Sequence, residues 1–361
     1  MTASIPYLSI VGWVRNDGYM EGYVERVQRA LRLLISQLDR HKVPTEIVVV
    51  EWNPPPDRPL FIDLVGDCRG EGYVTVRFVV VDARHHRSLI GSQFKGMHVI
   101  NAANVGMRRA RGRFLVPKGM DTFLTDSVIA QIARAQLRDD EFYRCDRYDV
   151  KVETVDWDQL TDAQILKRLS ESIVNHHDRI VQRPEWAMRD LHTNACGDFM
   201  LMSARRWHEI RGYPDDPTVL CFDSDSIALH AVAAHGVREV CWPDDCRVYK
   251  IVHGNIFILR ASEEWKTWQK RLDDFVTKYF SPDLRIKLRM WLDYPHRRIR
   301  GLESILGPSI ERNFVMKAQR YAHNDTSLVT NTEDWGLANE PLAERIIVRG
   351  NWDVEQKSLA G

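Results

Sequence analysis

The amino-acid sequence predicts an α/β fold, in which helices flank a mostly parallel central sheet and a helical extension follows towards the C-terminus. Two observations lead to this prediction. Short apolar runs, typical of buried parallel strands, alternate in the first half of the chain with segments whose apolar residues recur at helical spacing. After His253 the pattern changes, and the segments that follow are helical in character.

The first half of the chain supplies the predicted sheet. Between Tyr23 and His41 the apolar residues recur every three or four positions, which predicts an amphipathic helix. A second helix is predicted from Phe94 to Arg111. The predicted strands are 8–14, 46–52, 74–82 and 113–117. Because strands and helices alternate, we expect parallel strands joined by right-handed crossovers.

The second half is less regular. Its predicted strands are 199–202, 238–243 and 247–252, and a helix begins near Asp225. Further helices are predicted at 262–280 and 284–292, followed by a polar and irregular tail from about residue 320. We therefore expect one main domain over residues 1–255 and an extension over residues 256–361.

Composition narrows the functional classes. The 361 residues contain 50 Lys+Arg and 50 Asp+Glu, and this balance argues against a dedicated nucleic-acid binder. The N-terminal segment resembles a strand rather than a signal peptide, and no run approaches the roughly 20 apolar residues of a membrane span. The six cysteines lack zinc-type spacing. We expect a cytoplasmic protein, with peripheral membrane contact left open by the basic cluster 296–300.

Polar side chains follow three of the predicted strands. The segments are Arg15 to Asp17, Glu51 to Asn53 and Lys118 to Asp121, and each of them carries a carboxylate. In a parallel sheet the ligand lies beyond the carboxyl ends of the strands. The sequence therefore predicts a binding site formed by these three loops.

Three motifs carry a family resemblance. They are NVGMRRARGRFLVPKGMDTFLTD (104–126), GDFMLMSARRWHEIRGYPDD (197–216) and FDSDSIALHAVAAHG (222–236). Their order and spacing resemble those of the large inverting family of bacterial polysaccharide glycosyltransferases, which is family 2-like and has the GT-A fold. The resemblance covers roughly residues 7 to 255. It implies a Rossmann-like αβα sandwich with a nucleotide-binding half over 1–126 and an acceptor half over 127–255.

The resemblance also implies a set of nucleotide-binding residues. These are Arg15, Asp17, Glu51, Asn53, Asn104 and Lys118. Carboxylates can accept from base N–H groups and from ribose hydroxyls, whereas an amide can also donate to base carbonyls. An alternative for Glu51 and Asn53 is that they only end a strand before the proline turn at 54–56.

The metal-binding DxD motif of the family is incomplete here. The chain has Gly119-Met120-Asp121, so the first carboxylate is missing and the last is present. The resemblance implies that Asp121, helped by His253, binds a divalent ion such as Mn²⁺ or Mg²⁺. Alternatively, His253 only ends a strand, and Lys118 offsets part of the diphosphate charge as a cation does in metal-independent transferases.

Candidate catalytic and acceptor residues lie in the second half. Asp223 is the predicted general base that takes the proton of an acceptor hydroxyl, Asp225 is the alternative, and either could instead cap the following helix. Asp198 is a candidate for binding acceptor hydroxyls. The implied activity is sugar transfer from a UDP- or GDP-linked donor to a glycan or lipid-linked acceptor, with inversion. A retaining transferase, a nucleotidyltransferase and a catalytically silent sugar-nucleotide-binding protein are alternatives.

Overall fold

The structure is a computed structural model of the chain. It describes residues 5–18, 20–66, 70, 72–89, 92, 96–152, 157–179, 190–215, 224–252, 309–348 and 350. The chain divides into two compact units, one formed by residues 1–252 and 316–361 and the other by residues 253–315. This division differs from the predicted boundary at 255, because residues from 316 onward belong with the main unit.

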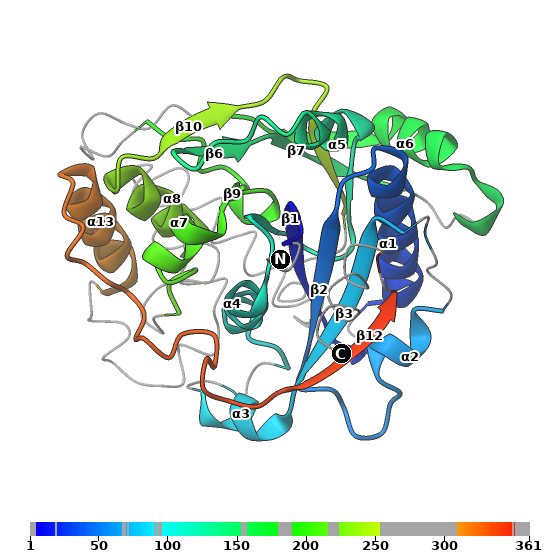
Figure 1. Ribbon diagram of the computed structural model, residues 1–361, viewed down its shortest axis with the longest axis horizontal. Helices are drawn as coiled ribbons and strands as arrows, with labels where there is room; N and C mark the ends of the chain where they lie inside the picture. Colours follow the sequence, from blue (N-terminus) through cyan, green and yellow to red (C-terminus); the bar gives the residue numbers. More distant parts are fainter. Residues whose placement is uncertain are drawn as a thin grey trace, which may run out of the picture. The chain divides into compact units, whose positions relative to one another are not determined.

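An eight-stranded sheet forms the centre of the main unit (Figure 1). Its order is β10 (Arg238–Cys241), β6 (Glu141–Arg144), β9 (Leu201–Ser203), β4 (Phe114–Pro117), β1 (Leu8–Val14), β2 (Thr45–Trp52), β3 (Val74–Val81) and β12 (Ala343–Val348). The pairs β1–β2, β1–β4, β2–β3 and β10–β6 are parallel, whereas β9 and β12 pair in antiparallel fashion. The predicted α/β class and mostly parallel central sheet are thereby confirmed.

Helices cover both faces of this sheet. Helix α1 (Tyr23–Arg40) packs its apolar stripe against Ile10 and other residues of one face. Helix α4 (Val99–Arg109) packs on the opposite face, where a Cβ at Gly106 would overlap Val11. Since successive side chains of a strand point to opposite faces, Ile10 and Val11 place the two helices in separate layers. The other α-helices within the described residues are α2 (Phe61–Leu64), α3 (Ala83–Ser88), α5 (Asp126–Ala133), α6 (Asp162–Glu171), α7 (Ala204–Glu209), α8 (Ser224–Ala234) and α13 (Ser309–Ala322).

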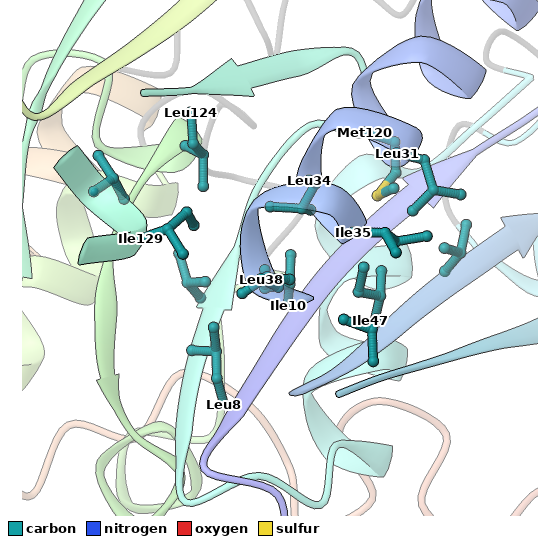
Figure 2. Close-up of a cluster of buried hydrophobic side chains, with 14 of the residues drawn as sticks. Leu8, Ile10, Leu31, Leu34, Ile35, Leu38, Ile47, Met120, Leu124 and Ile129 are labelled. Atoms are coloured by element: carbon teal, nitrogen blue, oxygen red, sulfur yellow. The ribbon is translucent and has the colours of Figure 1, made fainter. Parts of the chain in front are cut away.

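Figure 2 shows the core between α1 and the sheet. Leu31, Leu34 and Leu38 of α1 are at most 3% exposed, and they belong to the same buried cluster as Ile10 and Ile47 on adjacent strands. Burying one such side chain contributes about 1.5–3 kcal/mol. The helical spacing in the sequence thus reflects a continuous contact with the sheet.

A second, four-stranded sheet has the order β5 (Thr122–Leu124), β11 (Arg247–Ile251), β7 (Asp146–Val150) and β8 (Ile173–His177). One of its faces is apolar, because Phe123, Tyr249 and Tyr148 lie side by side and pack in a cluster with α6. The opposite face carries Lys250 and Asp149 at paired positions. This polar face contributes to the candidate site described below.

The tail of the chain is more ordered than the sequence predicted. β12 pairs with β3 and extends the main sheet by one strand (Figure 1). Arg77 of β3 donates to Glu344 over 2.9 Å and to Glu46 over 3.2 Å, and Arg109 donates to the carbonyl of Gly336 over 2.6 Å. These long-range contacts explain why a polar segment forms a strand.

No helix among the described residues combines the length and apolarity needed to cross a membrane.

Candidate functional site

The loops that follow β1, β2 and β4 meet at one edge of the main sheet. β1 pairs in parallel with β2 on one side and with β4 on the other, so the three strands end at the same edge. The Nε atom of Arg15 donates to the carbonyl of Asn53 over 2.8 Å and joins the first two loops. The backbone N–H of Lys118 donates to the carbonyl of Val11 over 2.9 Å and joins the third loop to β1. The predicted convergence is therefore observed.

The third loop lies across β1 because residue 12 is a glycine. A Cβ at Gly12 would overlap the Sδ and Cγ atoms of Met120. Met120 is 1% exposed and belongs to the hydrophobic core, so it anchors the loop that carries Asp121. The Thr122 hydroxyl donates to the carbonyl of Gly119 over 2.8 Å and closes the turn.

Arg15 and Asp17 form an ion pair at this edge, and their side chains are 16% and 23% exposed. Asn53 donates through its amide to the carbonyl of Gly96 over 3.0 Å. The backbone of Asn53 is left-handed, with φ of 47°, a conformation in which Asn is enriched. The structure thus brings three of the predicted nucleotide-binding residues together, with part-exposed donors and acceptors.

Glu51 has a different environment from Arg15, Asp17 and Asn53. It is fully buried, and its Oε1 accepts from the backbone N–H of Phe61 over 2.6 Å at the start of α2. Its Oε2 is buried without a hydrogen-bond partner among the described residues. Burial raises the pKa of Glu51 to about 7. Glu51 therefore orders the segment that follows the proline turn, which is the alternative that the sequence left open, and its role in nucleotide binding stays a prediction.

Asn104 lies in α4, where its side-chain amide is already engaged. Its Nδ2 donates to the carbonyl of Tyr213 over 2.8 Å, and its Oδ1 accepts from the N–H of Tyr213 over 2.8 Å. The side chain is 1% exposed. Both polar atoms therefore hold the backbone of a neighbouring loop, and the role of Asn104 in nucleotide binding stays a prediction.

Two carboxylates flank Gly119. A Cβ at that position would lie 3.3 Å from Oδ1 of Asp121 and 3.8 Å from Oδ1 of Asp198. The ammonium group of Lys118 is buried and donates to the carbonyl of Gly119 over 2.8 Å. Burial lowers the pKa of Lys118 to about 8, although both carboxylates oppose the shift. Gly119, which stands where the DxD motif has its first carboxylate, therefore lies between two acidic side chains, and even a Cβ there would be close to Asp121.

Asp198 is held by two cations from the second sheet. Its Oδ2 accepts from Arg147 over 2.6 Å, and its Oδ1 accepts from Nζ of Lys250 over 3.4 Å. Burial alone would raise the pKa of Asp198, but Lys250 and Arg147 lower it to about 2. Asp198 is thus ionised at neutral pH, and its predicted contact with acceptor hydroxyls stays a prediction.

The polar face of the second sheet extends this charged cluster. The Nε atom of Arg147 lies 3.0 Å from Oδ1 of Asp149, whose Oδ2 lies 2.7 Å from Nε2 of His177. Arg147 and His177 are cross-strand neighbours in β7 and β8, and Asp149 is paired with Lys250 of β11. Asp198 therefore lies in a polar cluster to which three adjacent strands contribute, through Lys250, Arg147 with Asp149, and His177.

The loop that leads to Asp198 is organised by the buried Arg144. Its guanidinium donates to the backbone carbonyls of His192, Asn194 and Cys196 over 3.1–3.4 Å. It also donates to Nδ1 of His192 over 3.1 Å. Burial, with the nearby positive charge of Arg144, lowers the pKa of His192 to about 3, so this imidazole is neutral. Arg144 thus positions the segment that carries Asp198 without lying at the surface itself.

Of the two candidate bases, only Asp225 lies within the described residues. Its Oδ2 accepts from the N–H of Gly197 over 2.6 Å, and its Oδ1 accepts from the N–H of Ser226 over 2.8 Å. Burial raises the pKa of Asp225 to about 6. Asp223 and the candidate metal ligand His253 lie outside the described residues.

Of the two predicted metal ligands, the described residues include Asp121 but not His253. Among them, no three His, Cys, Asp or Glu side chains group as metal ligands would. The negative charges of Asp121 and Asp198 raise the pKa of Lys118, against the lowering by burial, and Asp198 already binds two cations. A divalent ion at Asp121 would be repelled by these positive side chains.

Sequence reasoning missed Arg144, Arg147 and Lys250. A signal for two of them is present, because Arg147 alternates with Tyr148 in β7 and Lys250 alternates with Tyr249 in β11. Alternation of charged and aromatic residues indicates a strand with one polar and one apolar face. It does not indicate which site the polar face joins.

Comparisons with known proteins add a structural likeness only. No protein-family model matches the sequence, and no curated protein matches it. Three solved structures of TarS from S. aureus are similar in fold. TarS 1–349 in complex with UDP-GlcNAc has a TM-score of 0.43 and 11% identity, over 89% of this chain and 88% of that chain.

The other two structures are comparable. The longer TarS structure has a TM-score of 0.41 and 12% identity, over 88% of this chain and 50% of that chain. TarS 1–349 in complex with UDP has a TM-score of 0.40 and 13% identity, over 88% and 90%. At these TM-scores the likeness assigns no function, and the functional proposal rests on the residues of the site.

Proposed function

We propose that the chain is a glycosyltransferase that moves a sugar from a nucleoside diphosphate donor, UDP- or GDP-linked, to a hydroxyl of a glycan or lipid-linked acceptor. The observation that carries this proposal is the meeting of three polar loops at the carboxyl edge of a parallel sheet, with Asp121 and Asp198 on either side of Gly119. Ligands of open α/β sheets bind at this edge. The order of the three sequence motifs supports the same function.

The donor is assigned to the loops by chemistry. Arg15 and Asp17 offer part-exposed donors and acceptors to the base and ribose, and Asn53 completes that group. The diphosphate would then lie along the third loop, between Lys118 and Asp121. The sugar would face Asp198, which lies beside Gly119 of the third loop and accepts from Arg147 of the second sheet.

The reaction exchanges one C–O bond for another. The acceptor oxygen attacks the anomeric carbon of the sugar, and its proton passes to a carboxylate. The bond between the anomeric carbon and the phosphate oxygen breaks, and the nucleoside diphosphate leaves with the electron pair. We assign the proton to Asp223, with Asp225 as the alternative, and an in-line attack of this kind inverts the anomeric centre.

Two measurements test the function. Calorimetry with UDP and GDP, each with Mn²⁺ and with EDTA, should show binding of at least one nucleotide. Incubation with the corresponding nucleotide sugars should release the nucleoside diphosphate, and NMR of the transferred sugar should show an inverted anomeric configuration. Binding of neither nucleotide under any condition would exclude the proposal. Binding without any donor cleavage or transfer would favour a silent nucleotide-binding protein.

A further inference from the structure

Lys250 is a cation with unused hydrogen-bonding capacity beside the candidate diphosphate site. It lies in β11, directly opposite Thr122 of β5, which follows Asp121 in the chain. Its side chain is 27% exposed. A lysine ammonium group has three N–H donors, and the contact of Lys250 with Asp198 is the one polar contact of its ammonium among the described residues.

The contact between Lys250 and Asp198 is also weak. Its length is 3.4 Å, whereas charge-assisted N–H···O bonds are typically about 2.7–2.9 Å long. Asp198 keeps a shorter bond of 2.6 Å to Arg147, which is itself held by Asp149. The ammonium group of Lys250 can therefore turn towards an anion without leaving Asp198 unpaired.

The other two cations of the cluster are less suited to binding an incoming anion. The guanidinium of Arg147 already contacts three side chains of the cluster, which are Asp198, Asp149 and His177. The ammonium group of Lys118 is 1% exposed and donates to the backbone. Lys250 therefore differs from both in having exposed, unfilled donors.

We propose that Lys250 binds the diphosphate of the donor and supplies the positive charge that a divalent ion supplies in related enzymes. This inference rests on the proposed function and names the residue that recognises the leaving group. It follows from the position of Lys250 beside the third loop and from the exposed ammonium group that contacts Asp198 over 3.4 Å. The diphosphate carries the negative charge of the donor. It is therefore the part of the donor that a cation at this edge of the sheet would bind.

The test compares nucleotide binding with and without metal. We expect UDP or GDP to bind the wild-type chain equally well in EDTA and in Mn²⁺. In Lys250→Met, the Kd of the nucleoside diphosphate should rise about 10- to 100-fold, as for a lost hydrogen bond to a charged group. The Kd of the matching nucleoside should not change, because it has no phosphate. Lys250→Arg should retain most of the diphosphate affinity.

The matched control is Lys167→Met, which removes an exposed lysine of α6 whose ion-pair partner is Glu171. It should bind the diphosphate like wild type. The proposal is wrong if Lys250→Met binds the diphosphate normally, or if only its acceptor KM changes. It is also wrong if wild-type binding requires Mn²⁺, a comparison that does not depend on any variant folding. Failure of wild type to bind any nucleoside diphosphate would instead reject the proposed function, and this inference with it.

Discussion

Oδ2 of Asp225 accepts a hydrogen bond of 2.6 Å from the backbone N–H of Gly197. This bond ties the start of α8 to the turn that presents Asp198. Because Oδ1 of Asp225 also accepts from the N–H of Ser226, both carboxylate oxygens hold backbone groups in place. These contacts give Asp225 a structural role. The catalytic role is the one proposed for Asp223.

The first prediction compares Asp223→Asn with Asp225→Asn. Removing the general base should lower kcat by about 10²–10⁴ while donor affinity stays unchanged. We expect this result for Asp223→Asn. Asp225→Asn should lose less turnover and should lower the melting temperature, because an amide has one acceptor oxygen where the carboxylate has two. Steady-state kinetics, donor titration and thermal unfolding measure the three effects. The reverse pattern would make Asp225 the base, and two fully active variants would exclude both.

The second prediction concerns Gly12→Ala. The added methyl group would overlap Met120, so we expect a loss of about 1–3 kcal/mol of stability and weaker donor binding as the Asp121 loop shifts. Chemical denaturation and UDP or GDP titration measure these effects. The double variant Gly12→Ala/Met120→Ala provides the control, since the alanine at 12 should cost less where the sulfur has been removed. Additive losses in the double variant would show that the two side chains do not compete for this space.

The third prediction is a pH dependence at Glu51. Its pKa is raised from 4.5 to about 7 in the folded chain, so between these values the folded state holds a proton that the unfolded state has lost. Stability should therefore fall as pH rises through this window, by about 2–3 kcal/mol from this group. Glu51→Gln cannot titrate and should not show this part of the loss.

The measurement for Glu51→Gln is urea unfolding at pH 5, 6, 7 and 8. The variant should gain stability relative to wild type with each increase in pH. We also expect a difference in unfolding free energy between Glu51→Gln and wild type that does not depend on pH, because the amide places a donor at the buried Oε2 position. The test is therefore the slope with pH, and a difference that does not change with pH would contradict the prediction.

The fourth prediction tests whether Asn104 stabilises the fold or binds the nucleotide. In Asn104→Leu, the buried N–H of Tyr213 loses its acceptor, which should cost about 1–3 kcal/mol of stability. Nucleotide affinity should not change. Asn101→Leu is the control on the same helix, because its amide makes a longer contact of 3.4 Å with Asp215. A folded Asn104→Leu that no longer binds nucleotide would restore the original interpretation.

The sequence predicted secondary-structure elements correctly where the pattern depends only on neighbouring residues in the chain. The strands at 8–14, 46–52, 74–82 and 113–117 agree with β1 to β4 within one residue at each end. Each of these is a buried strand, so its apolar run is visible without knowledge of its partners. The loops that follow them were predicted for the same reason, since their position depends only on where the strands end.

The sequence by itself determined the parallel sheet, the amphipathic α1 and the edge at which Arg15, Asn53 and Asp121 meet. These depend on periodicity and chain order, which are properties of neighbouring residues. Only the tertiary structure decided that Asn104 binds Tyr213, that β12 completes the sheet and that Lys250 lies beside the third loop. The physical reason is that the hydrogen-bond partner of a side chain or an edge strand comes from distant segments, which the local pattern does not specify.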